Sequence, residues 1–159
     1  MTNHAVLSAS ASHRWLNCPP SVRLTEKLED KVSTYALEGT DAHELCAYLV
    51  ETALGRKARD PTENLTFYNE EMQHCAEEYR NYVVEQIEIA KAYSRDPTVL
   101  VEQRLDFSKW VPEGFGTGDC IIVADGLLQI IDYKHGLGVL VDADHNPQMM
   151  CYALGALES

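Results

Sequence analysis

Two aspartates and a lysine, Asp119, Asp132 and Lys134, are the residues of this chain best suited to chemistry. Carboxylates and water are the ligands that suit Mg²⁺ and Mn²⁺. A metal held by the two aspartates would lower the pKa of a bound water and stabilise charge on a phosphate. The lysine could hold that water and help to deprotonate it. The three residues therefore indicate metal-assisted hydrolysis of a phosphodiester.

The Asp125-Gly126 pair explains how these residues meet, because Asp-Gly between two strand-like runs is a strong signal for a two-residue hairpin turn. With this turn, Asp119 lies opposite Asp132, and directly opposed residues have Cβ atoms about 4.5–5.5 Å apart. Side chains alternate between the faces of a strand, so Lys134 shares the face of both aspartates. Two opposed carboxylates destabilise a hairpin unless a cation compensates for their charge.

A simpler interpretation of Asp132 and Lys134 stays open, since such a pair at a strand end is commonly a solvated salt bridge. The opposed Asp119 and the apolar neighbours on the same face favour the metal site.

The elements that must position this site follow from the hydrophobic pattern. Helices are predicted over residues 10–28, 40–54, 69–94 and 145–158, and strands over 98–107, 118–124 and 127–134. Ser10 or Ser12 and then Thr40 are the predicted N-caps of the first two helices, and Cys18-Pro19-Pro20 is predicted to break the first. This order predicts one α/β domain over residues 1–159, with a helical part over 1–96 and the strands and site over 97–159.

The composition limits the class of protein. Of the 159 residues, 45% are hydrophobic and 24% are charged, which is ordinary for a globular domain. The absence of a run of about 18 apolar residues and of a signal peptide predicts no membrane association and a cytoplasmic location. Five cysteines without a CxxC pair predict reduced thiols. A net charge of −12 excludes a broad basic surface, so DNA contact would need a local basic patch and the metal.

Five short motifs follow one another along the chain: Ser8-Ala9-Ser10 through Cys18-Pro19, Glu38-Gly39-Thr40-Asp41-Ala42-His43, Gly118-Asp119, Asp132-Tyr133-Lys134, and Gln148 through Tyr152. This series resembles the SxS…CP, GTxxH, GxxD-like, DYK and QxxxY motifs of RecB-like PD-(D/E)XK nucleases, which include many phage exonucleases. Each motif alone is weak, but the resemblance spans nearly the whole chain in the right order.

The resemblance implies a restriction-endonuclease-like core, in which helices flank a mixed sheet, with an N-terminal helical portion. It also implies roles. His43, Asp119 and Asp132 would bind Mg²⁺ or Mn²⁺ together with the backbone carbonyl of Tyr133, and Lys134 would be the catalytic lysine. The substrate-binding candidates are Gln148 and Tyr152, one turn apart on a helix, and Glu102 is a weaker candidate for a further acid.

Simpler structural roles stay open for several of these residues. His43 could be a residue at the edge of the core, and Gln148 and Tyr152 could be packing residues. The tyrosines of the long helix, Tyr79, Tyr82 and Tyr93, are predicted to pack in the core and not to form a platform for stacking bases.

The chain departs from the family pattern in two respects. Some relatives complete an iron–sulfur cluster with a cysteine like Cys18 and three more near the C-terminus; that trio is missing, so no complete cluster site is expected. A final core strand after the QxxxY helix is also missing, which indicates a C-terminally incomplete fragment.

We predict a Mg²⁺- or Mn²⁺-dependent deoxyribonuclease that cleaves single- or double-stranded DNA. The resemblance further implies an exonuclease of phage or mobile-element recombination, with a recombination protein as its partner. Two alternatives stay open: a catalytically inactive DNA-processing or assembly module that retains the fold, and a metal-binding regulatory domain. No motif indicates the oligomeric state.

Overall fold

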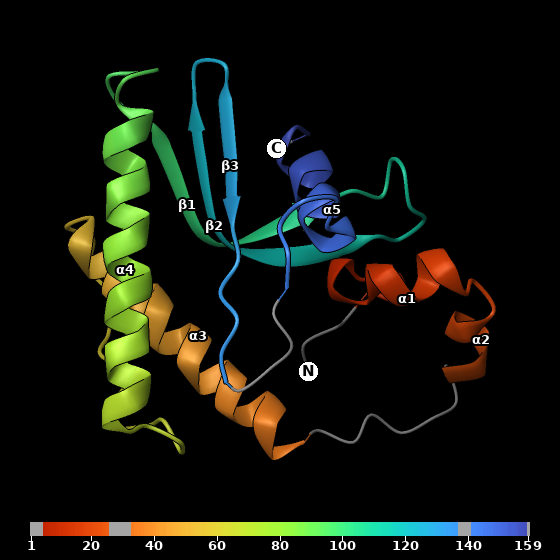
Figure 1. Cartoon of the computed structure of the whole chain (residues 1–159), viewed down its shortest axis with the longest axis horizontal. Coiled ribbons are helices and arrows are strands. Elements are labelled where there is room, and N and C mark those ends of the chain that lie inside the picture. Colours follow the sequence, from red (N-terminus) through yellow and green to blue (C-terminus); the bar gives the residue numbers. More distant parts are fainter. Residues whose placement is uncertain (1–4, 26–32, 137–140, 159) are drawn as a thin grey trace. The chain divides into compact units, whose positions relative to one another are not determined.

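The computed structural model describes residues 5–25, 33–136 and 141–158. Its elements, labelled as in Figure 1, are the short 3-10 helix η1 (Ala9–Ala11), the α-helices α1 (Ser12–Asn17), α2 (Ser21–Thr25), α3 (Thr34–Ala53), α4 (Glu70–Ala90) and α5 (Pro147–Ala156), and the strands β1 (Thr98–Asp106), β2 (Phe115–Ala124) and β3 (Leu127–Ile131). This mixture of helices and strands confirms the predicted α/β class. Among the described helices, none combines the length and the hydrophobicity that a membrane crossing requires.

The three strands form an antiparallel sheet in the order β1-β2-β3. The mixed sheet that the resemblance implies needs a parallel strand, and none is present in residues 5–25, 33–136 and 141–158. The hairpin that joins β2 to β3 is the part of this sheet that matters for the candidate site.

The predicted register of the β2–β3 hairpin is confirmed. The strands pair from Ala124 with Leu127 up to Cys120 with Ile131. Gly126 in the turn has a φ of 73°, a left-handed conformation that glycine adopts without strain. Because β3 ends at Ile131, the opposed positions of the two aspartates fall one step beyond the last pair.

Replacing Gly126 with alanine is expected to lower the free energy of unfolding by about 1 kcal/mol, because the added Cβ strains a left-handed residue. Gly39 is the matched control. It lies within α3 and has open space around its Cα, so Gly39→Ala should raise the free energy of unfolding by about 0.5–1 kcal/mol. Urea unfolding of both variants measures the two changes, and effects of equal sign would contradict this account.

The chain divides into two compact units. The α3–α4 unit comprises Val32–Glu102 and Asp119–Val139, and the α5 unit comprises Met1–Lys31, Gln103–Gly118 and Leu140–Ser159.

The α3–α4 unit has a core in which the two long helices cover one face of the sheet (Figure 1). The fully or nearly fully buried members come from both helices and from β1 and β2: Ala42, Leu45, Cys46, Val50, Met72, Ala76, Val83, Ala90, Val99, Cys120 and Ile122. Their spacing on α3 and α4 follows the i, i+3, i+4 pattern of an apolar helix face. The side chains of Ser33 and Asn69 cap α3 and α4 by accepting from the backbone N–H groups of Ala36 and Met72.

The α5 unit depends on two close approaches to helix α5. A Cβ on Gly116 would lie 2.7 Å from the Tyr152 ring, and one on Gly155 would lie 2.9 Å from Cβ of Leu105. Only glycine fits at these positions without displacement. Tyr152 and Leu105 are buried as a result.

Several predicted boundaries differ from the observed ones. The helix predicted to begin at Thr40 begins at Thr34; Ser33 is its cap, and the hydroxyl of Thr40 donates to the carbonyl of Ala36 within the helix. Neither Ser10 nor Ser12 caps α1, because its N-cap is Ala11, which has no side-chain acceptor. The predicted break at Cys18-Pro19-Pro20 is confirmed, since α1 ends before it and α2 begins after it.

The prediction that the tyrosines of the long helix pack in the core is confirmed for Tyr79 and wrong for the other two. Tyr79 is 8% exposed, whereas Tyr82 and Tyr93 are 51% and 53% exposed. The i, i+3 spacing from Tyr79 to Tyr82 carries Tyr82 beyond the edge of the buried stripe.

Candidate metal centre

Three side chains that can bind a metal gather in the α3–α4 unit: His43 of α3, Glu102 of β1 and Asp119 of β2. One ligand atom from each lies within 4.8 Å of the others. A nitrogen and two carboxylate oxygens at this spacing can converge on one divalent cation. Among the described residues this is the one group of three or more such side chains.

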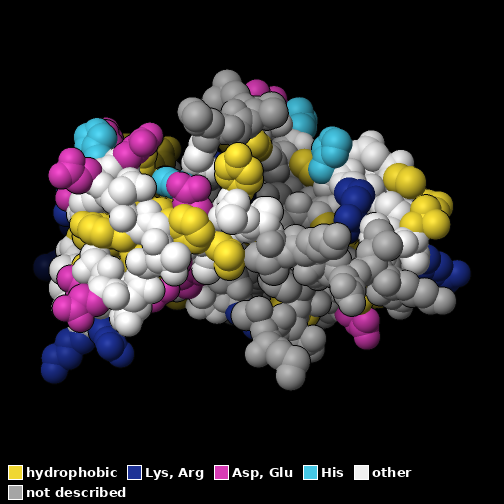
Figure 2. All heavy atoms as spheres, turned by 90° about the horizontal axis from the view of Figure 1, so that it is seen from below, with side chains coloured by type: hydrophobic (Ala, Val, Ile, Leu, Met, Phe, Trp, Pro, Cys, Tyr) yellow, Lys and Arg dark blue, Asp and Glu magenta, His cyan; other side chains and the backbone are white. Residues whose placement is uncertain are grey.

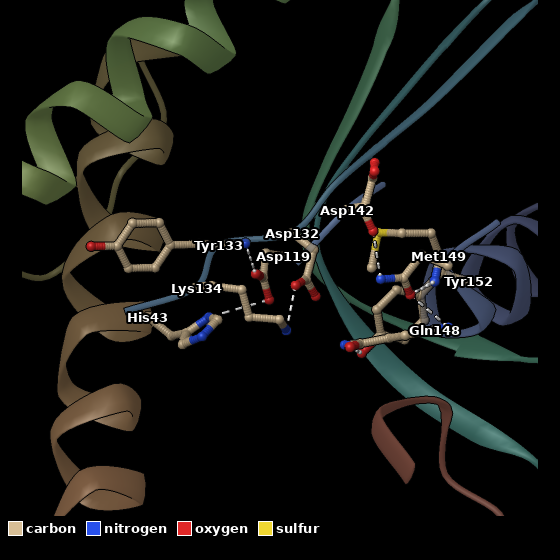
Figure 3. Close-up of polar contacts among 10 residues, drawn as sticks. His43, Asp119, Asp132, Tyr133, Lys134, Asp142, Gln148, Met149 and Tyr152 are labelled. Atoms are coloured by element: carbon tan, nitrogen blue, oxygen red, sulfur yellow. Dashed lines mark hydrogen bonds and ion pairs between the residues drawn. The ribbon is translucent and has the colours of Figure 1, made fainter. Parts of the chain in front are cut away.

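Asp119 is held through both of its carboxylate oxygens. Its Oδ2 accepts a hydrogen bond from the backbone N–H of Tyr133 at 2.6 Å, and its Oδ1 lies 3.2 Å from Nδ1 of His43 (Figure 3). The residue is 9% exposed. A buried carboxylate fixed in this way is oriented before any ligand arrives, which lowers the ordering cost of binding.

The charges around His43 favour its protonated form. Burial alone would lower the pKa of His43, but the hydrogen bond and charge of Asp119, followed by the charges of Glu102 and Asp132, raise it. A divalent cation would satisfy the same negative charges, so a proton and a metal ion would compete for this position.

Glu102 occupies an unusual backbone position. Its φ is 49°, the left-handed region that residues with a Cβ rarely adopt, and it lies within a strand. Strain of this kind clusters at functional sites. Although the Glu102 side chain reaches solvent, partial desolvation and then the charge of Asp119 raise the pKa of Glu102 from 4.5 to about 7.

This shift predicts a pH dependence of stability for the metal-free protein. The folded state binds the Glu102 proton more tightly than the unfolded state, so the stabilisation is fully present below the unfolded pKa of about 4.5 and is lost as the pH rises through about 7. Glu102→Gln should therefore raise Tm by roughly 2–4 °C at pH 8 and have little effect at pH 4.5. Thermal unfolding in EDTA across this pH range measures the effect.

Glu113→Gln is the matched control for Glu102→Gln. Glu113 is also an exposed glutamate with a positive φ, 56°, but it is not part of the metal-binding group. A Tm that rises equally in both variants would show that neutralising any glutamate of this acidic chain has the same effect, and would contradict the prediction.

Asp132 and Lys134 form an ion pair between the Oδ2 and Nζ atoms. The Asp132 side chain is 6% exposed, whereas that of Lys134 is 50% exposed. Burial and then the charge of Asp119 raise the pKa of Asp132, although the hydrogen bond from Lys134 opposes the shift. The simpler interpretation, a salt bridge at a strand end, thus describes the contact, but this bridge is not a fully solvated one.

The predicted metal-binding set is therefore assembled in part. The structure brings His43 and Asp119 together, adds Glu102, and leaves Asp132 outside the group of three. Tyr133, predicted to bind the metal through its carbonyl, uses its backbone N–H to hold Asp119. Its ring stands edge-on to His43, with ring centroids 5.7 Å apart, and to Tyr79, with centroids 5.2 Å apart.

A pocket of about 890 Å³ in the same unit reaches Asp132 and Lys134. Its lining combines tyrosine, carboxylate and histidine side chains, among them Tyr35, Glu38, Tyr79, Tyr82, Tyr133 and His135. Figure 2 shows acidic, histidine and hydrophobic side chains close together on the face over this unit. The pocket therefore connects the ion pair of Asp132 and Lys134 with these side chains.

Gln148 and Tyr152, the predicted substrate-binding pair, belong to α5 and thus to the other unit. They share a helix face as predicted, since Nε2 of Gln148 donates to the Tyr152 hydroxyl at 3.1 Å. Tyr152 is 4% exposed and packs against Gly116. This contact gives Tyr152 a packing role, and its role towards substrate stays a prediction.

Two residues that the sequence analysis did not single out join the surroundings of the metal-binding group. His135 places Nδ1 3.1 Å from the Tyr133 hydroxyl and Nε2 3.6 Å from Oε1 of Glu38. Glu38 stands at the start of the motif that contains His43, and His135 directly follows the DYK motif, so their proximity to the motifs was the available signal.

The donor set of two carboxylates and one histidine does not identify the ion. Carboxylates suit Mg²⁺ and Mn²⁺, whereas imidazole is a common ligand of transition metals. Neither ion needs a cysteine, and all five cysteines are free thiols.

Comparisons with known proteins give one family. The family model described as "Protein of unknown function (DUF2800)" matches residues 4–159. Among solved structures, none matches this chain.

Proposed function

The chain belongs to the DUF2800 family, and we propose, from its own residues, that it is a metal-dependent nuclease that hydrolyses DNA phosphodiester bonds. The observation that carries the proposal is the convergence of His43, Glu102 and Asp119 within 4.8 Å. Asp119 is also hydrogen-bonded to the segment after β3, which contains Asp132 and Lys134. Opposed acids of this kind are costly in a metal-free fold, which favours a cation as their partner.

The proposed role of each residue follows from its position. His43, Glu102 and Asp119 would hold Mn²⁺ or Mg²⁺, with Asp132 and the Tyr133 carbonyl as additional ligands. When bound, the ion would activate a water and stabilise charge on the phosphate. Lys134, whose side chain is half exposed, would orient the attacking water and assist its deprotonation, while Asp132 holds the lysine in place.

The finer identity proposed is a RecB-like PD-(D/E)XK nuclease that acts in the cytoplasm. The order of the five sequence motifs supports it, together with the hairpin that places Asp119 beside the DYK segment. The same resemblance supports an exonuclease of phage or mobile-element recombination that acts on single- or double-stranded DNA with a recombination protein. Gln148 and Tyr152 would contact the substrate in this scheme.

One assay tests the proposal. The protein is incubated with labelled single- and double-stranded DNA in Mn²⁺, in Mg²⁺ and in EDTA. Cleavage that requires the metal is expected. DNA that stays intact under every condition, while Mn²⁺ binds, would overturn the nuclease and leave a metal-binding domain.

The second candidate is a catalytically inactive DNA-processing or assembly module. The net charge of −12 favours it, since DNA binding by a nuclease gains most from basic surface. In the same assay, this candidate predicts a gel shift of the DNA without any product. The two candidates therefore give opposite results in one experiment.

A further inference from the structure

Tyr133 supports two of the three metal-binding residues at once. Its backbone N–H donates to Oδ2 of Asp119 at 2.6 Å, and its ring stands edge-on to His43 at a centroid distance of 5.7 Å and an angle of 80° (Figure 3). A displacement of Tyr133 would therefore move both the N–H group that holds Asp119 and the ring that contacts His43.

The position of Tyr133 is itself fixed from the far end of its side chain. The Tyr133 hydroxyl lies 3.1 Å from Nδ1 of His135. The tautomer of the imidazole decides which of the two groups donates in this hydrogen bond. The other ring nitrogen, Nε2, lies 3.6 Å from Oε1 of Glu38.

These contacts close a ring of interactions on helix α3. Glu38 and His43 both belong to α3, and the path from Glu38 through His135 and Tyr133 returns to His43. The segment after β3 is thereby attached to α3 at two points. The His135 side chain is 10% exposed and that of Glu38 is 35% exposed, so the path is shielded from competing water at its centre.

We infer that Glu38 and His135 are positioning residues of the metal centre, which act through Tyr133 to hold Asp119 and His43 at metal-binding distance. This inference rests on the proposed function for the metal itself. Partners of this kind, one contact removed from the ligands, commonly change metal affinity by about 10–100-fold.

Mn²⁺ affinity, measured by isothermal titration calorimetry, tests the inference. Tyr133→Phe removes only the hydroxyl and keeps the ring and the backbone N–H; it should weaken Mn²⁺ binding by about tenfold. His135→Leu should weaken it as much, and the double variant should be no worse than either single one, because both changes break the same path. Tyr82→Phe, the same deletion on an exposed tyrosine of the same pocket, should leave the affinity unchanged.

Rescue variants distinguish positioning from a general loss of structure. His135→Asn keeps a hydrogen-bonding side chain near the Tyr133 hydroxyl and should recover most of the Mn²⁺ affinity that His135→Leu loses. Glu38→Gln should retain part of the wild-type Mn²⁺ affinity. The EPR spectrum of bound Mn²⁺ should broaden in His135→Leu and return towards the wild-type shape in His135→Asn, which a change in fold alone would not produce.

The outcomes separate the inference from the proposed function. If wild-type protein binds Mn²⁺ and the Tyr133→Phe and His135→Leu variants bind it equally well, the inference is overturned and the metal centre stands. If wild-type protein binds no Mn²⁺, both are overturned. Weaker binding in both variants, with rescue by His135→Asn, supports the inference.

Discussion

Replacing Lys134 with alanine is expected to lower the rate of DNA cleavage by about 100-fold or more, the usual cost of removing a group that acts on charge and protons in the transition state. Metal binding should persist, because the lysine is not one of the converging ligands. The variant would thus separate chemistry from metal affinity. Cleavage is measured with saturating Mn²⁺ under single-turnover conditions, and metal affinity by calorimetry.

Lys91→Ala is the matched control for this experiment. Lys91 is also a half-exposed lysine in an ion pair, with its Nζ 2.6 Å from Oε1 of Glu88, and its side chain is 47% exposed against 50% for Lys134. Its variant should cleave DNA at the wild-type rate. If Lys134→Ala cleaves DNA at a rate close to that of Lys91→Ala, Lys134 has no role in catalysis. Its ion pair with Asp132 would then have only a structural role.

Replacing Asp119 with asparagine is expected to weaken Mn²⁺ binding by more than about 100-fold, the upper end of what changes around the ligands cost. Asparagine preserves the shape and can still accept the hydrogen bond from the backbone of Tyr133, but it removes one of the two carboxylate charges of the metal-binding group. At about 100 times its dissociation constant, Mn²⁺ should stabilise wild-type protein by about 2.7 kcal/mol and leave the variant nearly unaffected. The shift of Tm on adding Mn²⁺ measures this difference.

Asp106→Asn provides the control for the loss of a carboxylate. Asp106 also lies in a strand and accepts a backbone hydrogen bond, from the N–H of Ser108 at 2.8 Å, but it is exposed and outside the metal-binding group. Its variant should keep the full Mn²⁺-induced shift of Tm. An Asp119→Asn variant that is stabilised by Mn²⁺ as strongly as Asp106→Asn would show that the ion binds elsewhere.

The hairpin was predictable because its determinants are local. An Asp-Gly pair fixes the turn, and the turn fixes every pair up to Cys120 with Ile131. The sequence could not predict that β3 ends at Ile131, which lets the backbone N–H of Tyr133 bond to the Asp119 side chain and not to the opposite strand.

Glu102 was harder to recognise for a different reason. Nothing in the residues around it signals a left-handed backbone within a strand, because residues other than glycine and asparagine seldom adopt one. The start of α3 was missed for a similarly local reason. The exposed turn from Thr34 to Leu37 contributes no apolar stripe, so only its cap, Ser33, marked the true beginning.

Residues along the β2–β3 hairpin lie at regularly increasing distances from Asp119, up to the exposed turn. Five paired positions separate Asp125-Gly126 from Asp119, which corresponds to about 17 Å along the strands. Mn²⁺ is paramagnetic, and its broadening of NMR signals falls steeply with distance. Amide signals along the hairpin should therefore be lost near Cys120 and Ile131 and return stepwise towards Gly126, so the gradient would locate the bound ion without altering any residue that holds it.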